Sequence, residues 1–309
     1  MILLWFGAMA VGFGLSLAAS RRAVHHGSAL ASSTNIPPFI IGVTLFAIGT
    51  DLPEIANSII SSAAGHGDLN VGDSVGSTLV QATLVLGLLP LLVGPFRVKQ
   101  RIGVIGTVTV AMLVVGVLLA SDGQLTRLDG TVLLGGWVVG TLLTWRYIPA
   151  IAEPVMPVPA RRRSHNAVAA LTALGLVGAG AALAVAAFIE IAKEVEISEY
   201  VISFFVASIG TSLPELIFTV TALRRSERDL AVGDVMGSSF VDATLSIGIG
   251  PFLFPTAVTA SQAVRGGLVA AVTIAIVVVV LTRVAKHDWR TGLLLIGLYA
   301  ASYPALLLL

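Results

Sequence analysis

The chain alternates long apolar stretches with short polar or proline- and glycine-rich breaks along its whole length. A bilayer core about 30 Å thick requires roughly 20 apolar residues for each helix that crosses it, and the apolar stretches have this length. They predict an all-α integral membrane protein with ten transmembrane helices. The predicted spans are 1–20, 36–64, 69–94, 102–121, 128–148, 167–191, 198–223, 230–254, 264–283 and 290–308.

The composition favours a polytopic membrane protein over a soluble one. Of the 309 residues, 56% are hydrophobic and 11% are charged, whereas charged residues make up about 25% of a typical soluble domain. The net charge of +1 provides no electrostatic basis for binding nucleic acid. The chain has no cysteine, which excludes disulfides, thiolate metal sites and cysteine nucleophiles.

The basic residues predict how the helices are oriented in the cell membrane. With ten alternating spans, fifteen of the eighteen Lys and Arg residues fall on one side, and only Arg127, Lys193 and Arg265 fall on the other. The positive-inside rule places the basic side in the cytoplasm, so both termini should be extracytoplasmic. A secretory signal has basic residues before its apolar stretch. Here Arg21 and Arg22 follow the stretch, which favours a first membrane helix.

A sequence repeat divides the chain into two halves. Residues 49–87 align without a gap with residues 210–248 at a constant offset of 161, and 17 of the 39 aligned positions are identical. Each half, 1–148 and 167–309, then holds five spans, and the proline-rich segment 149–166 is a cytoplasmic linker between them. Because five is odd, the second half should be inverted in the membrane. Inverted repeats are typical of secondary transporters, which bind substrate near the midplane where helices are interrupted.

Each repeat has a proline inside its first predicted helix. Pro53 and Pro214 lack the backbone N–H that would pair with the carbonyl four residues earlier. An unpaired carbonyl in hydrocarbon is costly unless it faces a cavity or an ion. The prolines therefore favour a cation site near the midplane.

Oxygen-bearing side chains gather around these prolines. Asp51 and Glu54 are three residues apart, which places both on one helix face. Acidic side chains inside membrane spans are expensive and functional by default. Calcium and sodium prefer oxygen ligands, whereas zinc and copper prefer His or Cys. The predicted cation site consists of Asp51, Glu54, Glu215, Asp242, Thr50, Thr211, Ser212, Ser77, Ser238 and Gln81.

Other residues of the repeats are predicted to be structural. Asp73 and Asp234 lie near the predicted starts of two helices, where an acid in the first turn stabilises the helix dipole. Small residues allow close helix packing or local unwinding, and those at equivalent positions are Gly72, Gly76, Gly233 and Gly237. All the histidines fall in predicted connections and are expected to be solvated: His25, His26, His66, His165 and His287.

At these residues the sequence resembles the prokaryotic type of the sodium/calcium exchanger family, within the cation/calcium antiporter superfamily. The two alpha repeats of that family carry GTSLPE-like and VGNxxGSNxFN-like motifs. GTSLPE at 210–215 agrees in full, and GTDLPE at 49–54 agrees except at one residue. The resemblance implies that Glu54 and Glu215 bind calcium and help to bind sodium. It also implies further ligands: the side chains of Thr50, Thr211, Ser77, Ser238 and Ser212, the often acidic position Asp242, and the main-chain carbonyls of Ala47 and Ser208.

Three departures from the family pattern bear on the coupling ion. Asp51 stands where the family usually has serine, which adds a carboxylate. Gln81 replaces an asparagine, and glutamine occurs in the corresponding helix of proton/calcium exchangers. The third departure is the replacement of asparagines by Thr78, Ser239, Asp73 and Asp234.

The residues and the resemblance together predict a secondary active antiporter that exchanges calcium for sodium by alternating access, with no enzymatic activity and no cofactor. The alternative is a proton-coupled antiporter of calcium or another divalent cation, and potassium co-transport stays open. A passive channel would need no counter-ion. An intramembrane aspartyl protease could use Asp73 and Asp234, but it leaves the paired Pro-Glu motifs unexplained. Nothing in the sequence specifies an oligomeric state.

Overall fold

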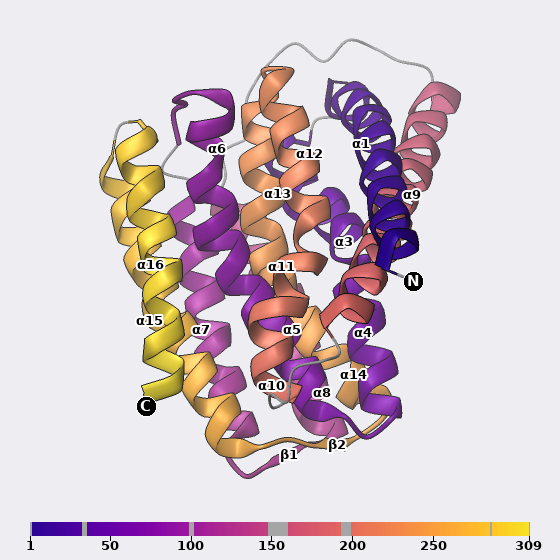
Figure 1. Cartoon of the computed structure of the whole chain (residues 1–309). Helices are drawn as coiled ribbons and strands as arrows, with labels where there is room; N and C mark the ends of the chain where they lie inside the picture. Colours follow the sequence, from indigo (N-terminus) through magenta and orange to yellow (C-terminus); the bar gives the residue numbers. More distant parts are fainter. Residues whose placement is uncertain are drawn as a thin grey trace.

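The computed structural model describes residues 2–32, 36–98, 102–147, 160–192, 199–284 and 286–308, and these are mainly helical (Figure 1). A small two-stranded sheet at one end pairs β1 (Gln124–Leu125) with β2 (Thr256–Ala257) in antiparallel fashion. The helices of the first half are α1 (Ile2–Ser32), α2 (Pro38–Ile41), α3 (Ala47–Thr50), α4 (Leu52–Ala63), α5 (Gly67–Val80), α6 (Leu86–Val93), α7 (Ile102–Ala120) and α8 (Arg127–Tyr147). Those of the second half are α9 (Ala160–Ala192), α10 (Glu199–Ile202), α11 (Ser208–Thr211), α12 (Leu213–Arg224), α13 (Arg228–Val241), α14 (Ile247–Leu253), α15 (Ala260–Arg283) and α16 (Trp289–Leu308).

The local structure repeats as closely as the sequence does. Four π-helical segments interrupt the α-helices: η1 (Gly42–Phe46), η2 (Gln81–Val85), η3 (Ser203–Ala207) and η4 (Asp242–Ser246). Every element from α2 to η2 begins and ends 161 residues before its counterpart from α10 to η4. The two halves therefore share not only residues but also the positions at which their helices start, break and widen.

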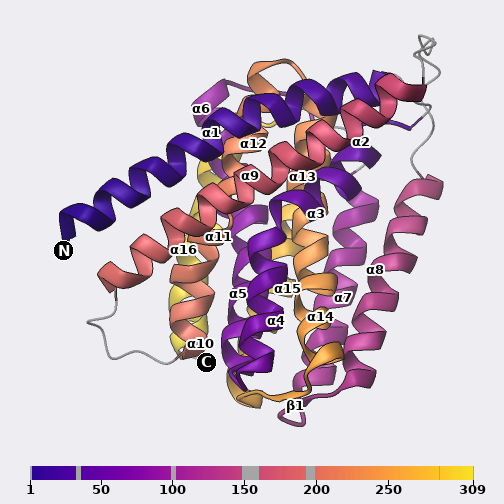
Figure 2. The same ribbon diagram turned by 90° about the vertical axis from the view of Figure 1, so that its right-hand side faces the viewer.

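Two long helices lie side by side and cross the other helices obliquely (Figure 2). These are α1 and α9, which contact each other extensively. The Ser16 hydroxyl donates a hydrogen bond of 2.8 Å to the Val177 carbonyl. The spans predicted at 1–20 and 167–191 were too short, because α1 continues to residue 32 and α9 begins at residue 160. Beyond the two arginines of α1, Ala23 and Val24 are fully buried, so one apolar face continues and keeps the segment helical.

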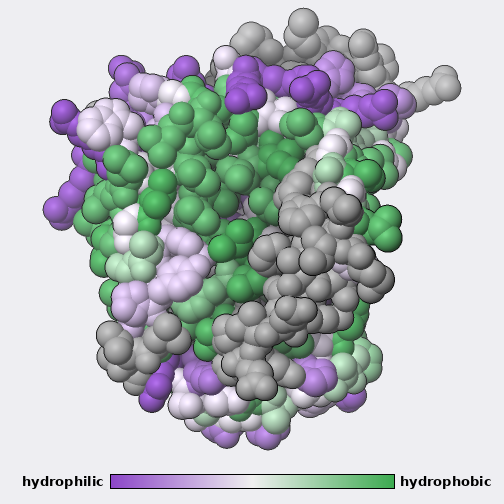
Figure 3. All heavy atoms as spheres, in the orientation of Figure 1, coloured by the Kyte–Doolittle hydropathy of each residue, from purple (hydrophilic) through white to green (hydrophobic). Residues whose placement is uncertain are grey.

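The hydrophobic lengths fit a membrane protein. Six helices of the described part are long and apolar enough to cross a membrane, or seven if one bent pair is counted as a single span. That pair is Pro38–Thr50 with Leu52–Ala63, bent by 48°. Figure 3 shows a broad hydrophobic face between polar ends of the molecule. The segment 148–159, which forms most of the predicted linker, lies outside the described residues, and its last seven positions are the start of α9.

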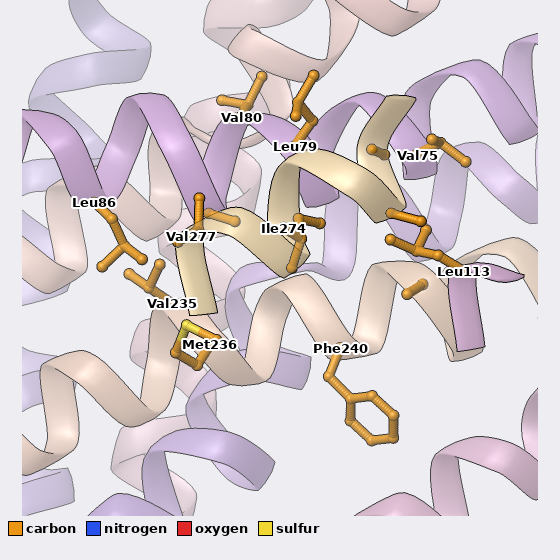
Figure 4. Close-up of a cluster of buried hydrophobic side chains, with 14 of the residues drawn as sticks. Val75, Leu79, Val80, Leu86, Leu113, Val235, Met236, Phe240, Ile274 and Val277 are labelled. Carbon is orange, nitrogen blue, oxygen red and sulfur yellow. The ribbon is translucent and has the colours of Figure 1, made fainter. Parts of the chain in front are cut away.

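A large apolar core holds the central helices together. Val75 and Leu79 of α5, Met236 of α13, and Ile274 and Val277 of α15 all belong to this core (Figure 4). α5 and α13 are buried along nearly their whole length, so nearly all of their side chains beyond the first turn contact protein. Polar residues on these two helices must therefore find partners inside the molecule.

The repeat glycines allow the backbones of the central helices to approach one another. Gly72 and Gly76 of α5 lie against the carbonyls of Tyr200 and Phe204, at α10 and η3. The equivalent glycines of α13, Gly233 and Gly237, lie against α2 and η1 in the same way. The close-packing interpretation of these glycines is confirmed.

Adding one methyl group at this contact should destabilise the fold. In Gly76→Ala, the new Cβ would collide with the Phe204 backbone, and overpacking of this kind costs about 1–3 kcal/mol. Gly116→Ala on α7 is the matched control, because its Cβ meets nothing within 4 Å and alanine is the better helix former. The thermal unfolding midpoint in detergent should fall for the first variant and be unchanged or higher for the second.

The expectation that all five histidines are solvated holds for His25, His66 and His165, which are exposed, and is wrong for His287. His25 and His26 lie on α1 and His165 on α9, because both helices extend beyond their predicted ends. His287, between α15 and α16, is fully buried. Its Nε2 lies 2.9 Å from the Leu86 carbonyl, and its Nδ1 lies 2.6 Å from the Thr291 hydroxyl.

Burial lowers the pKa of His287 below its usual range. The unfolded chain therefore takes up a proton at a higher pH than the folded chain, so stability falls as the pH drops below about 6.5. Above that pH the contribution is constant. His287→Gln should be less stable at pH 7.5 but should lose less of its remaining stability between pH 7.5 and 5.5. Unfolding midpoints of wild type and His287→Gln, measured between pH 7.5 and 5.5, test this prediction. Midpoints that fall equally with pH in the two proteins would contradict it.

Candidate functional site

Two broken helices form the centre of the molecule. The first break is at Asp51, between α3 and α4, and the second is at Ser212, between α11 and α12. Both residues have nearly the same backbone angles, φ −80° with ψ 8° and 6°. Pro53 and Pro214 are the second residues of the helices that follow. A proline is tolerated in the first helical turn, where no intrahelical donor is needed, so the helix restarts there instead of kinking through the proline.

Four carboxylates lie together beside these breaks, all of them fully buried. One oxygen from each of Asp51, Glu54 and Asp242 lies within 4.8 Å of the other two. The Glu215 carboxylate is close enough to repel these three electrostatically. Two unit charges at 4.8 Å repel by roughly 3 kcal/mol even at an effective dielectric constant of about 20. The cluster therefore requires compensating positive charge.

Most oxygens of this cluster have no hydrogen-bond partner among the described residues. Both oxygens of Asp51, Glu54 and Glu215 and one oxygen of Asp242 are buried and unpartnered, as are Gln81 Oε1 and Ser212 Oγ. Buried polar groups in proteins are almost always satisfied, and an unsatisfied one marks a site for an ion, a water molecule or catalysis. These oxygens thus form a donor set of the kind that hard cations bind.

Hydroxyl groups link each broken helix to the central helix of the other half. The Thr50 and Ser238 hydroxyls are 3.2 Å apart, and the equivalent Ser77 and Thr211 hydroxyls are 3.1 Å apart. All four residues are buried. The structure therefore brings the predicted hydroxyl ligands of both halves together next to the carboxylates.

The two predicted carbonyl ligands belong to the last turns before the breaks. The Ala47 carbonyl accepts the Asp51 amide at 3.0 Å, and the Ser208 carbonyl accepts the Ser212 amide at 3.1 Å. A carbonyl oxygen has two lone pairs, so each retains one for a further partner. The Ser208 hydroxyl donates to the Phe204 carbonyl and so is committed within its own helix.

One hydrogen bond joins equivalent positions of the two halves directly. Gln81 Nε2 donates to Asp242 Oδ2 at 2.9 Å, and the two residues are 161 positions apart. Both stand at the start of a π-helical segment, η2 or η4. Such segments occur frequently at functional sites. The bond fixes the Asp242 carboxylate and leaves its Oδ1 and the Gln81 Oε1 directed elsewhere.

The expectation that Asp73 and Asp234 act as first-turn acids is wrong. α5 begins at residue 67 and α13 at residue 228, so each aspartate lies in the second turn, where it is fully buried. Each accepts a hydrogen bond from a predicted ligand of the other half: Asp73 from Thr211 at 3.1 Å, and Asp234 from Thr50 at 3.4 Å. The two aspartates therefore hold the hydroxyl groups of the site in place and do not cap helices.

Sequence reasoning missed the residues that hold these two aspartates. Asn57 Nδ2 donates to Asp73 at 2.7 Å, and Thr219 Oγ1 donates to Asp234 at 3.0 Å. Asn57 lies six residues after Asp51 and Thr219 seven after Ser212, on the same helices as the glutamates. The available signal was that Asp73 and Asp234 occupy equivalent repeat positions inside apolar surroundings, which calls for a nearby donor.

Polar contacts that the sequence did not indicate also join α4 and α5 to α14. The Gly250 amide donates to Ser58 Oγ at 3.0 Å, and Asn70 Nδ2 donates to the Ile247 carbonyl at 3.2 Å. The positions equivalent to Ser58 and Asn70 are Thr219, which bonds Asp234, and Ala231, which has no polar side chain. The corresponding positions of the second half therefore do not make the equivalent of these two contacts.

Comparison with known proteins matches almost the whole chain. The family model described as sodium/calcium exchanger protein matches residues 4–146 and 165–306. The chain belongs to the sodium/calcium exchanger family. This is a family of transporters, and membership agrees with the apolar helices in making this chain a multi-pass membrane protein.

Similar proteins and a similar solved structure are known for this exchanger. The putative antiporter CaxA of Alkalimonas amylolytica is 31% identical over 84% of this chain and 84% of that protein. The sodium/calcium exchanger MaX1 of Methanosarcina acetivorans is 25% identical over 84% and 85%. A structure of the sodium-calcium exchanger NCX_Mj, soaked with Na⁺ and Sr²⁺, superposes with a TM-score of 0.80 at 26% identity and covers 98% of each chain.

Proposed function

We propose that this exchanger is a secondary active antiporter that moves calcium across the membrane in exchange for sodium by alternating access. The buried group of four carboxylates carries this proposal, because seven of its oxygens have no hydrogen-bond partner among the residues that the structure describes. A calcium ion or several sodium ions would supply the positive charge that the group requires. Family membership and the relatives named as sodium/calcium exchangers support the same ions.

In this proposal the transported ions bind between the two breaks. Glu54 and Glu215 would hold calcium, and sodium would use the same glutamates with the nearby hydroxyls and carbonyls. The complete proposed ligand set is Glu54, Glu215, Asp51, Asp242, Thr50, Thr211, Ser212, Ser77, Ser238, Gln81, Ala47 and Ser208. Because the ions share ligands, binding of one kind excludes the other, and this exclusion couples the two fluxes.

We further propose that ten spans form two inverted five-helix repeats, 1–148 and 167–309, with both termini extracytoplasmic. The common element boundaries at an offset of 161 support two equivalent halves. The excess of basic residues on one side supports the orientation. α1 and α9, which lie across the breaks, would slide over the remaining helices when the site changes the side to which it opens.

Proton coupling is the second candidate, and one observation favours it. Asp51 adds a fourth buried carboxylate at a position where the second half has Ser212. One calcium ion balances only two of four negative charges, so protons or additional cations must balance the others. This would make protons part of the transport cycle, either with sodium or in its place.

The deciding experiment measures calcium uptake into proteoliposomes under separate sodium and proton gradients. Wild type should take up calcium only when the vesicles contain sodium, and Glu54→Gln should not take it up. Glu227→Gln is the matched control, because Glu227 lies in the connection between α12 and α13, outside the site. Uptake driven by a proton gradient alone would assign proton coupling, and uptake without any gradient would refute antiport.

A further inference from the structure

A groove between α1 and α12 lies apart from the cation site. Its walls are apolar, with Leu17 from α1 and Leu216, Ile217 and Val220 from α12. The Ser20 hydroxyl of α1 approaches the Ile217 carbonyl at 3.4 Å beside this groove. It therefore lies where two helices that contact each other diverge toward the surface.

Basic side chains line the same groove. Arg21 of α1 and Arg224 and Arg225 at the end of α12 all belong to its lining and are exposed. Among the described residues, none of those that line the groove is acidic. These arginines lie near the α12–α13 connection at the polar end of the molecule, which borders the hydrophobic face (Figure 3). A groove with an apolar wall and a cationic rim thus opens near the expected boundary between acyl chains and head groups.

Comparison of the two repeats separates the part of this groove that occurs in both halves from the part that occurs in one. The apolar wall recurs in the first half, where Ile55 and Ile59 match Leu216 and Val220. The arginines do not recur, since the positions that match Arg21, Arg224 and Arg225 are Ala182, Ala63 and Ala64. The positive-inside rule explains why basic residues lie at this end. It does not require three of them, from two helices distant in sequence, to converge on one groove.

We propose that this groove binds an anionic phospholipid. Arginine forms bidentate hydrogen bonds with phosphate oxygens, and basic pockets between helices at the cytoplasmic surface recognise acidic head groups. The apolar wall, led by Leu216 and Val220, would contact the upper part of one acyl chain. The lipid phosphate would bridge Arg21 of α1 and Arg224 of α12. This binding does not depend on which ions the protein exchanges.

Lipid binding to the purified full-length chain tests the proposal. Protein in detergent is equilibrated with phosphatidylglycerol and phosphatidylcholine in competition, and bound lipid is counted by native mass spectrometry. Wild type should retain one phosphatidylglycerol in preference to phosphatidylcholine. The R21A/R224A/R225A variant should lose this preference by about tenfold or more, which corresponds to about 1.4 kcal/mol. The control R146A/R283A/R290A removes three exposed arginines outside the groove lining and should behave as wild type.

A second variant keeps all the arginines and blocks the apolar wall. Val220→Trp fills the groove, so retention of phosphatidylglycerol should fall although the charge is unchanged. Equal retention by wild type and R21A/R224A/R225A would overturn the proposal and leave these arginines only a role in orientation. Equal loss in the control variant would overturn it as well, because the attraction would then depend on total charge. Unfolding midpoints show whether each variant is folded. If R21A/R224A/R225A does not fold, the retention of phosphatidylglycerol by Val220→Trp tests the proposal instead.

Discussion

Glu215→Gln should weaken calcium binding at least about 30-fold and reduce exchange to a similar extent. The side chain is fully buried, and within the described part of the chain neither of its oxygens has a hydrogen-bond donor, so its charge must be balanced by a bound cation or a proton. Loss of one member of a buried charge pair costs about 2–5 kcal/mol, and each 1.4 kcal/mol is a factor of ten. Calcium titration of the purified protein by calorimetry measures the change.

Two further variants test whether the loss of calcium binding is specific to the site. Glu227→Gln removes the same charge outside the site and should bind calcium as wild type does. Glu54→Gln changes the corresponding glutamate of the first half and should match Glu215→Gln within a few fold, because the two occupy equivalent positions. Normal calcium affinity in folded Glu215→Gln protein would show that the carboxylate cluster is not where calcium binds.

Asp51→Ser should lower the number of sodium ions exchanged for each calcium by about one. The substitution makes the first break like the second, where Ser212 stands, and leaves three carboxylates to be neutralised. Since a buried site admits ions until its charge is compensated, one fewer monovalent cation should accompany each cycle. The reversal potential of exchange in proteoliposomes, measured against the sodium and calcium gradients, gives the ratio directly.

The pH dependence of the same variant separates sodium from proton coupling. If protons neutralise Asp51 in wild type, the sodium ratio will stay the same in Asp51→Ser and the pH dependence of exchange will change. If both the ratio and the pH dependence stay unchanged, Asp51 takes no part in charge compensation. Ser212→Ala, which removes a hydroxyl at the equivalent position without changing the charge, is the matched control.

The sequence predicted the helices most accurately where apolar length and turn residues act together. For eight of the ten predicted spans the boundaries agree with the structure within about four residues. The exceptions are the first and sixth. Arg21 and Arg22 end the apolar run in the sequence, but the helix continues because Ala23 and Val24 pack against other helices. Such packing depends on residues distant in sequence and is not visible in a local pattern.

The candidate site could be predicted mainly because the same motif occurs in both repeats, and less because of any single residue. The Pro-Glu motifs located both breaks, and the structure brings Asp51, Glu54, Glu215 and Asp242 together, as their repeat positions suggested. Asp73 was misassigned because a helix that starts at residue 69 has Asp73 as its fifth residue, close to the first turn, whereas α5 begins two residues earlier and Asp73 is fully buried. Its donor Asn57 has no counterpart in the second half, where position 218 is phenylalanine, so the repeat could not reveal it.

The bond between Gln81 and Asp242 bears on how such a chain evolved. If two identical five-helix chains once assembled as a pair, these positions held the same residue facing itself. Two aspartates would repel each other, and two glutamines would bring no charge. An amide opposite a carboxylate requires two different residues, which became available once gene duplication allowed each copy to mutate alone. The contact at the centre of the molecule therefore records a step that a symmetric ancestor could not have taken.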